Sequence, residues 1–264
     1  MAKIIAISNQ KGGVGKTTTA INLGASLAAN DLSVLLIDCD PQGNATTGLG
    51  IEKGPETLTL YDALLLGVPL QDVLVKTQCQ RFDLAPADKN LVAANLDLVD
   101  VPERESQLSK ILAPVRDSYQ YILVDCPPAL DLLTLNALVA ADSVLVPIQC
   151  EFFALEGISQ LIDTVEKVRE AFSRPLRLEG ILLTMYDDRT NLARQVAEDL
   201  REFFNNEVFT TVIPRSIRLA EAPSYGQPIL MYDPRSRGAE SYINLAKEIL
   251  KNEQRDRQAA QGTR

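Results

Sequence analysis

Two lysines flank a glycine-rich turn near the start of the chain, in the stretch QKGGVGKTT at residues 10–18. Glycines allow successive backbone N–H groups to turn inward around phosphate oxygens, and a helix that starts at the turn adds its positive N-terminal end. At this spacing Lys16 would neutralise the β- and γ-phosphates of a nucleotide, and the Thr17 hydroxyl would coordinate Mg²⁺. The ordinary loop pattern has a glycine where Gln10 stands, so this loop departs from it and carries Lys11 as an additional lysine.

Three aspartates stand at or just after the ends of apolar runs that are typical of buried strands. Asp38 ends VLLID, Asp125 ends YILVD, and Asp40 follows two residues after Asp38. Ligands of parallel sheets bind at the carboxyl ends of strands, so Asp125 would hold Mg²⁺ through water and Asp38 would lie near the same ion. The chain has no histidine, which leaves acid–base chemistry to carboxylates, lysines, backbone groups or a bound ion. The alternative for Asp38 and Asp40 is turn formation before Pro41.

Strand and helix patterns alternate along most of the chain and predict the elements that position these residues. Strands are expected at 3–8, 33–40, near 81–87, and at 121–125, 143–148, 178–185 and 207–214. Helices are expected at 17–30, 59–67, about 131–141, about 155–172, 191–204 and about 239–251. This alternation indicates one α/β domain, residues 1–252, with a mostly parallel, twisted sheet covered by helices on both faces. Residues 253–264 have few apolar side chains and are expected to form a flexible tail.

Several motifs resemble those of the ParA/MinD ATPases, a family of P-loop NTPases. KGGVGKT, residues 11–17, is similar to the deviant Walker A sequence of that family. LLIDCDPQGNAT at 35–46 resembles its second motif, and YILVDCPP at 121–128 resembles its Walker B region. PRSIRLAEAPSYGQPI at 214–229 and YDPRSRGAE at 232–240 are similar to the ParA branch called Soj. The resemblance covers residues 1 to about 250 and implies ATP and Mg²⁺ as cofactors.

The resemblance also implies roles for individual residues. Lys11 would reach the nucleotide held by the other subunit of an ATP-bound homodimer, where two facing triphosphates need countercharge; the alternative is a solvated loop lysine. Asp40 would orient the attacking water, so Lys11, Lys16 and Asp40 are the expected catalytic residues, and the expected metal ligands are Thr17, Asp38 and Asp125. The nucleotide is expected to contact Lys11, Gly12, Gly13, Val14, Gly15, Lys16, Thr17 and Thr18, with its adenine near Met185, Pro214, Arg215 and Ser216.

The overall charge taken alone opposes a nucleic-acid partner, because the net charge is −9 and the sequence pI is about 4.7. That value describes the average field and does not exclude a local basic patch. Several arginines fall in or beside the helix expected at 191–204 and after the next strand, but acids are interleaved with them, so a mixed solvated face is the alternative. The resemblance implies non-specific binding of double-stranded DNA by the ATP-bound dimer, through Arg189 and Arg218 along its edge.

The function expected from these features is DNA segregation, of a chromosome or a plasmid, driven by slow, Mg²⁺-dependent ATP hydrolysis. A ParB/Spo0J-like centromere-binding protein would stimulate hydrolysis and release the dimer from DNA. The sequence has neither a signal-peptide pattern nor an apolar run of about 18 residues, so we expect a cytoplasmic, nucleoid-associated protein without a membrane partner.

Three alternatives use the same kind of loop. A MinD-like regulator at a membrane surface or cell pole ends in an amphipathic helix with bulky apolar residues, whereas this chain ends in QRDRQAAQGTR. An iron–sulfur reductase needs two cluster-binding cysteines per subunit, and Cys126 lacks the glycine-rich surroundings expected of one. The third alternative, a transcriptional or cell-pole regulator of the same fold, is not excluded by the sequence.

Overall fold

The chain folds around a mostly parallel sheet of seven strands in the order β3-β4-β2-β5-β1-β6-β7. In this computed structural model, the residues described are 1–54, 56–151, 154–173 and 175–262. Only β3 runs antiparallel to its neighbour, β4. The strands are β1 Lys3–Ile7, β2 Val34–Asp38, β3 Val75–Lys76, β4 Phe82–Ala85, β5 Tyr121–Asp125, β6 Ser143–Gln149 and β7 Arg177–Thr184.

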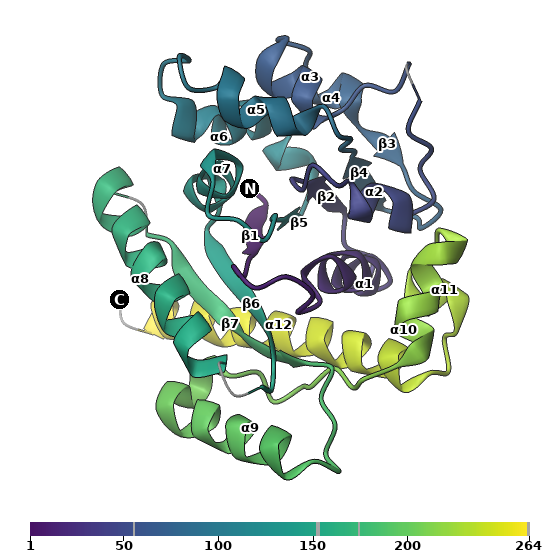
Figure 1. Cartoon of the computed structure of the whole chain (residues 1–264), viewed down its shortest axis with the longest axis vertical. Coiled ribbons are helices and arrows are strands. Elements are labelled where there is room, and N and C mark those ends of the chain that lie inside the picture. The colour runs from purple at the N-terminus through teal and green to yellow at the C-terminus, as the bar shows by residue number, and fades with distance from the viewer. Residues whose placement is uncertain (55, 152–153, 174, 263–264) are drawn as a thin grey trace.

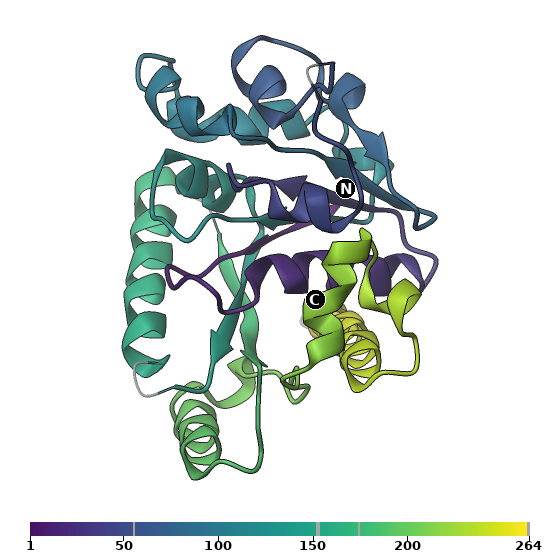
Figure 2. The ribbon, with the colours of Figure 1, turned by 45° about the vertical axis from the view of Figure 1, so that its right-hand side comes forward.

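The two faces of the sheet are covered by separate hydrophobic cores. Alternate residues of β1 serve opposite faces, as a period of two requires: Ile4 packs into one core and Ile5 into the other. Figures 1 and 2 show the covering helices on both sides. The core around Ile5 includes residues of α1 Lys16–Ala28, α2 Asn44–Gly48, α10 Ile217–Glu221, α11 Ile229–Tyr232 and α12 Arg237–Gly262.

The core around Ile4 is formed with the remaining α-helices of the described chain. They are α3 Leu60–Leu65, α4 Leu70–Val73, α5 Leu91–Asp97, α6 Gln107–Leu112, α7 Leu132–Ala140, α8 Ala154–Phe172 and α9 Asn191–Phe204. Short 3-10 turns, η1 Arg104–Ser106, η2 Arg116–Ser118, η3 Asn205–Glu207 and η4 Ala222–Tyr225, join some of these elements. None of the helices in the described part of the chain has both the length and the apolar composition that a membrane span requires.

Strand register brings the predicted chemistry to one edge of the sheet. Asp125 at the end of β5 lies beside Ile7, the last residue of β1, and beside Asp38, the last residue of β2. The glycine-rich loop follows β1 directly and leads into α1. The loop and both aspartates therefore meet at the carboxyl ends of neighbouring parallel strands, as the sequence predicts.

The segment 207–214, expected as a strand, makes isolated bridges, from Val208 to Ile181 in β7 and from Pro214 to Tyr186 just after β7. Phe209 and Ile213 still donate backbone hydrogen bonds to β7, over 2.9 and 2.8 Å. The amides of Thr210 and Thr211 instead donate to the Glu248 carboxylate on α12, over 2.7 and 2.9 Å. The prediction of a strand was wrong, because the Glu248 carboxylate, distant in sequence, accepts the hydrogen bond of the Thr211 amide, which a continuous ladder would direct to β7.

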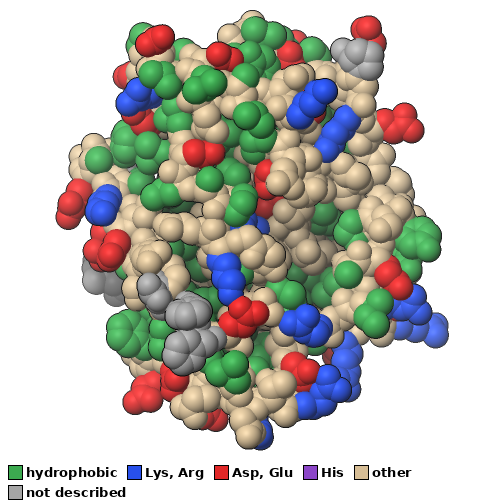
Figure 3. Space-filling view, viewed as in Figure 1, with side chains coloured by type: hydrophobic (Ala, Val, Ile, Leu, Met, Phe, Trp, Pro, Cys, Tyr) green, Lys and Arg blue, Asp and Glu red, His purple; other side chains and the backbone are tan. Residues whose placement is uncertain are grey.

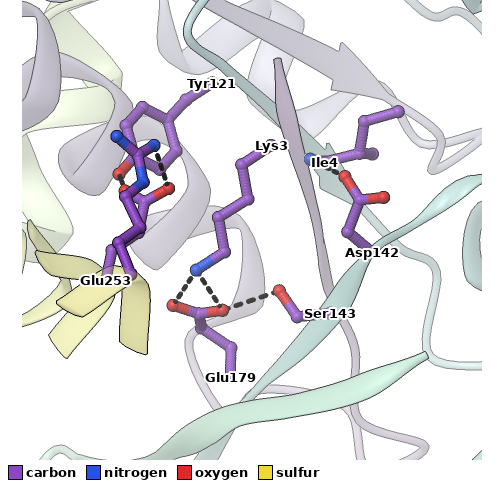
Figure 4. A network of polar contacts seen from close by, with 8 residues as sticks. Lys3, Ile4, Tyr121, Asp142, Ser143, Glu179 and Glu253 are labelled. Atoms are coloured by element: carbon purple, nitrogen blue, oxygen red, sulfur yellow. Dashed lines mark hydrogen bonds and ion pairs between the residues drawn. The ribbon is translucent and has the colours of Figure 1, made fainter. Parts of the chain in front are cut away.

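The last helix continues past residue 251, where its apolar pattern ends, as far as Gly262. Figure 4 shows how polar contacts hold its final turns against the amino ends of the strands: Glu253 accepts a hydrogen bond from the Tyr121 hydroxyl. Nearby, Glu179 pairs with Lys3 at 2.8 Å and accepts a hydrogen bond from Ser143 at 2.7 Å. No break in helix marks the boundary expected at 252; the flexibility of the residues beyond it stays a prediction.

Replacing Tyr121 with phenylalanine is expected to loosen the end of α12, because the variant loses the hydrogen bond to Glu253. An ordinary hydrogen bond corresponds to roughly three- to tenfold in a local opening equilibrium, so amide exchange in the last turns of α12 should accelerate by about that factor. Tyr119→Phe is the matched control, since the Tyr119 hydroxyl donates to Asp83 and not to α12. Equal exchange in wild type and Tyr121→Phe would show that this contact does not hold the helix.

Candidate nucleotide-binding site

The glycine-rich loop has a backbone that only glycine adopts readily at two positions. Gly13 and Gly15 have φ of 74° and 90°, in the left-handed region. Thr184, at the end of β7, holds the loop in place, because its hydroxyl donates a hydrogen bond to the carbonyl of Val14 at 2.7 Å. Asn9 holds the entry to the loop by donating to the carbonyl of Pro147 at 2.8 Å. The loop is thus held against the ends of β6 and β7, directly before α1.

Lys16, the first residue of α1, has a buried side chain that folds back over this loop. Its ammonium donates to the carbonyl of Lys11 at 3.1 Å. Burial lowers the pKa of Lys16, and the nearby charge of Asp125 opposes that shift. A cation that is already largely removed from water interacts strongly with an anion placed beside it. This position suits the terminal phosphates of a nucleotide.

Asp38 and Asp125 are both fully buried at the ends of adjacent strands. Asp38 accepts hydrogen bonds from the amide and the hydroxyl of Thr46, at 2.8 and 2.6 Å. Neither carboxylate oxygen of Asp125 has a hydrogen-bond partner among the described residues. Burial, followed by the charge of Asp38, raises the pKa of Asp125, while the Thr17 hydroxyl lies close enough to oppose that rise. Two buried carboxylates beside a hydroxyl fit a hard cation such as Mg²⁺, which would supply the missing partner.

Asp40 lies at the start of a tight turn that follows β2. Its carboxylate accepts a hydrogen bond from the amide of Gln42 at 2.9 Å, and its carbonyl accepts one from Gly43 at 2.8 Å. The side chain lines a cavity of about 430 Å³, a size suited to a small ligand. Lys16 lines the same cavity. A phosphate, a cationic side chain and a carboxylate that can orient water would therefore meet in one space.

Most of the predicted nucleotide contacts line this cavity, and three do not. The lining includes Gly12, Gly13, Gly15, Lys16, Thr17, Thr18, Met185, Pro214 and Ser216. Val14 is buried behind the loop, and Arg215 donates its amide to the carbonyl of Tyr186 at 3.2 Å. Met185 has a φ of 48°, which is uncommon for this residue type, and marks a sharp turn after β7.

Lys11 is the third predicted residue outside the cavity lining of its own chain. Its side chain is 49% exposed and forms an ion pair with the carboxylate of Glu151, which is 45% exposed. Its backbone amide is fixed by the side chain of Asn9 at 2.9 Å. The two lysines of the loop are therefore placed differently: Lys16 is buried at the cavity, and Lys11 lies at the surface.

Sequence reasoning missed several residues of the cavity wall: Gln42, Asn44, Thr184, Ile213, Leu219, Ala220 and Tyr242. Thr184 had a detectable signal, because it is a small polar residue at the carboxyl end of a predicted strand. Tyr242 had none. Its hydroxyl lies 3.2 Å from that of Thr19, which links α12 to α1 across 223 positions of sequence.

The two arginines expected to bind DNA lie outside the cavity and are paired with acids. Arg189 forms two side-chain hydrogen bonds to Asp187, at 2.8 and 2.6 Å, and that pairing lowers the pKa of Asp187 to about 2. Arg218 pairs with Glu221 at 3.0 Å and with Asp233 at 3.6 Å. Both arginines are exposed. On the face drawn in Figure 3, basic and acidic side chains are interleaved in the same way.

A phosphate loop between β1 and α1, with carboxylates at the next strand ends, defines a P-loop nucleotide-binding protein. A family model described as an AAA domain matches residues 2–178. The sporulation initiation inhibitor protein Soj of Bacillus subtilis (strain 168) is 54% identical over 252 residues, 96% of this chain and 100% of that protein. The chromosome partitioning protein ParA of Myxococcus xanthus (strain DK1622) is 51% identical over 253 residues, 96% and 89% of the two chains. The chain belongs to the Soj/ParA family.

A solved structure supports the same fold. Cobyrinic acid a,c-diamide synthase from Mycobacterium smegmatis, with bound ADP and magnesium, matches with a TM-score of 0.84 and 35% sequence identity. The match covers 96% of each chain. The predictions of a ParA-type family and of a P-loop α/β fold are thereby confirmed.

Proposed function

We propose that this protein is a Mg²⁺-dependent ATPase that segregates DNA, of a chromosome or a plasmid. The observation that carries the proposal is that Lys16 and Asp40 line one cavity, while the buried Asp38–Asp125 pair ends the neighbouring strands with the charge of Asp125 close to Lys16. Curated relatives named as chromosome partitioning proteins support the cellular role. The solved neighbour with ADP and magnesium supports the choice of cofactors.

In the proposed reaction each residue has a distinct task. The loop amides and Lys16 bind the phosphates, and Thr17, Asp38 and Asp125 would hold Mg²⁺, directly or through water. When bound, the ion neutralises charge that develops on the phosphate oxygens. Asp40 orients the water that attacks the γ-phosphate, because its carboxylate lines the cavity and is fixed by the amide of Gln42. We expect turnover of the protein alone to be slow.

The proposal includes a homodimer that forms when ATP is bound, with Lys11 reaching the nucleotide of the other subunit. Lys11 is exposed and does not line the cavity of its own chain, so its ammonium is accessible to a second copy. The ion pair with Glu151 has to open for this contact. Exposed ion pairs contribute only about 0–1 kcal/mol, so a partner's triphosphate can replace Glu151 at little cost.

Non-specific binding of double-stranded DNA is the second part of the proposal. Arg189 and Arg218 are exposed, and DNA phosphates would replace their acidic partners. One subunit would then bind DNA weakly, and a dimer would bind it more tightly because two patches contact the DNA together. DNA binding of this kind is compatible with a net charge of −9. A ParB-like partner would stimulate hydrolysis and release the dimer, which is nucleoid-associated while ATP is bound.

Arg189→Ala and Arg218→Ala are each expected to weaken DNA binding and to reduce its salt dependence. Each lost phosphate contact lowers the slope of log affinity against log salt by about one. Fluorescence anisotropy with duplex DNA across a salt series measures both quantities. Lys110→Ala is the matched control, because Lys110 is also exposed and ion-paired, with Glu103. If ATP-dependent dimerisation falls in parallel, the arginines belong to the dimer interface and not to a DNA surface.

A further inference from the structure

The orientation of the Asp40 carboxylate depends on the peptide that follows Pro41. The amide of Gln42 donates to that carboxylate at 2.9 Å, and the amide of Gly43 donates to the Asp40 carbonyl at 2.8 Å. These short-range bonds join Asp40 to the Pro41–Gln42 and Gln42–Gly43 peptides as one turn. A movement of the Gln42 backbone therefore changes where the carboxylate points in the cavity.

One side of this turn rests on a buried part of the protein. The hydroxyl of Thr46, on α2, donates a hydrogen bond to Asp38 at 2.6 Å and accepts one from the amide of Ala87 at 2.9 Å. A Cβ atom built on Gly43 would lie 2.4 Å from the carbonyl oxygen of Ala87. Gly43 also has a φ of 61°, so both its backbone conformation and this close approach favour glycine. The segment after β4 is thus a fixed support beneath the turn.

A lysine lies against the same part of the turn as Ala87. Lys53 donates from its ammonium to the carbonyl of Gln42 at 3.0 Å. The Cβ position built on Gly43 would lie 2.4 Å from the Lys53 Nζ and 2.8 Å from its Cε, so the side chain lies directly against the glycine. Lys53 is exposed and lines a groove of about 920 Å³ together with Pro41 and Gln42.

We propose that Lys53 is a positioning residue for ATP hydrolysis. Its hydrogen bond to the Gln42 carbonyl fixes the Gln42 backbone beside the support at Ala87, so that the Gln42 amide keeps the Asp40 carboxylate facing the cavity. Lys53 does not line the nucleotide cavity and acts through Asp40 alone. The inference rests on the proposed role of Asp40 in hydrolysis.

Lys53→Met tests this role, because methionine keeps much of the apolar stem and removes the ammonium. We expect kcat for ATP hydrolysis to fall about three- to tenfold, the factor for one hydrogen bond of ordinary strength, with KM unchanged. Lys53→Arg is expected to recover kcat to within about twofold, since a guanidinium can also donate to the carbonyl. Lys89→Met is the matched control: Lys89 is exposed in the same groove, and its variant should hydrolyse ATP like wild type.

Other outcomes overturn the inference. Wild-type kcat in Lys53→Met, an equal loss in Lys89→Met, or a rise in KM alone would each show that Lys53 does not position Asp40. A fall in kcat accompanied by a lower melting temperature and no recovery in Lys53→Arg would show a merely structural role. Asp40→Ala in the same assay separates the two proposals: if it hydrolyses ATP at the wild-type rate, the role of Asp40 fails on its own.

Discussion

ATP binding is expected to fall by roughly two orders of magnitude or more when Lys16 is replaced with alanine. The ammonium is buried at the cavity, and truncating one partner of a buried, hydrogen-bonded charge pair costs about 2–5 kcal/mol of binding. Folding should not suffer, because burial already lowers the pKa of Lys16 and the variant no longer buries that charge. Titration with a fluorescent ATP analogue measures the affinity, and a thermal melt reports on the fold.

Lys11→Ala is the matched control for this experiment, since both lysines belong to the same loop. Lys11 lies at the surface and does not line the cavity of its own chain, so a monomer of that variant should bind ATP with an affinity close to wild type. Its defect should appear in ATP-dependent dimerisation. A normal ATP affinity in Lys16→Ala would refute the assignment of the phosphate loop.

Asp40→Ala is expected to bind ATP but to lose hydrolysis by about 10²- to 10⁴-fold, the usual contribution of a positioned acid or base. The loop, Lys16 and the Asp38–Asp125 pair remain in place, so the nucleotide site itself is retained. With ATP the variant should accumulate as a dimer, because hydrolysis no longer resets it. Phosphate release measures the first effect, and size-exclusion chromatography with light scattering measures the second.

Asp31→Ala provides a control for this variant, because Asp31 is an almost fully exposed aspartate, with 96% of its side chain accessible. It should hydrolyse ATP like wild type and return to the monomer. If Asp40→Ala stays monomeric with ATP, the proposed coupling of hydrolysis to dimer release does not hold.

The phosphate loop and the sheet could be predicted because their signals are local. The GK[ST] spacing lies within one turn, and the apolar runs that end in Asp38 and Asp125 identify two strands by composition alone. The alternation of strands and helices predicts parallel strands, and ligands collect at the carboxyl ends of such strands, so both aspartates are expected near one ligand. The register of Asp38 opposite Asp125 agrees with that rule.

Features that depend on distant partners were not predictable in this way. The 207–214 segment has a strand pattern, but two of its amides donate hydrogen bonds to the Glu248 carboxylate, which is 38 and 37 positions away in the sequence. The end of α12 lacks an apolar pattern, and its contact with Tyr121 spans 132 positions. The hydrogen bond from Lys53 to Gln42 spans only 11 positions, yet an exposed lysine has no sequence signal that specifies its acceptor.

DNA binding by Asp40→Ala, measured with ATP and then with ADP across a salt series, tests the central claim most directly. This variant is expected to keep its ATP unhydrolysed, so DNA binding should not decrease during the measurement. We predict binding of duplex DNA with ATP only, lost steeply as salt increases because phosphate contacts release counterions. Equal binding with both nucleotides, or binding with neither, would contradict the account of a DNA-segregation ATPase controlled by its nucleotide.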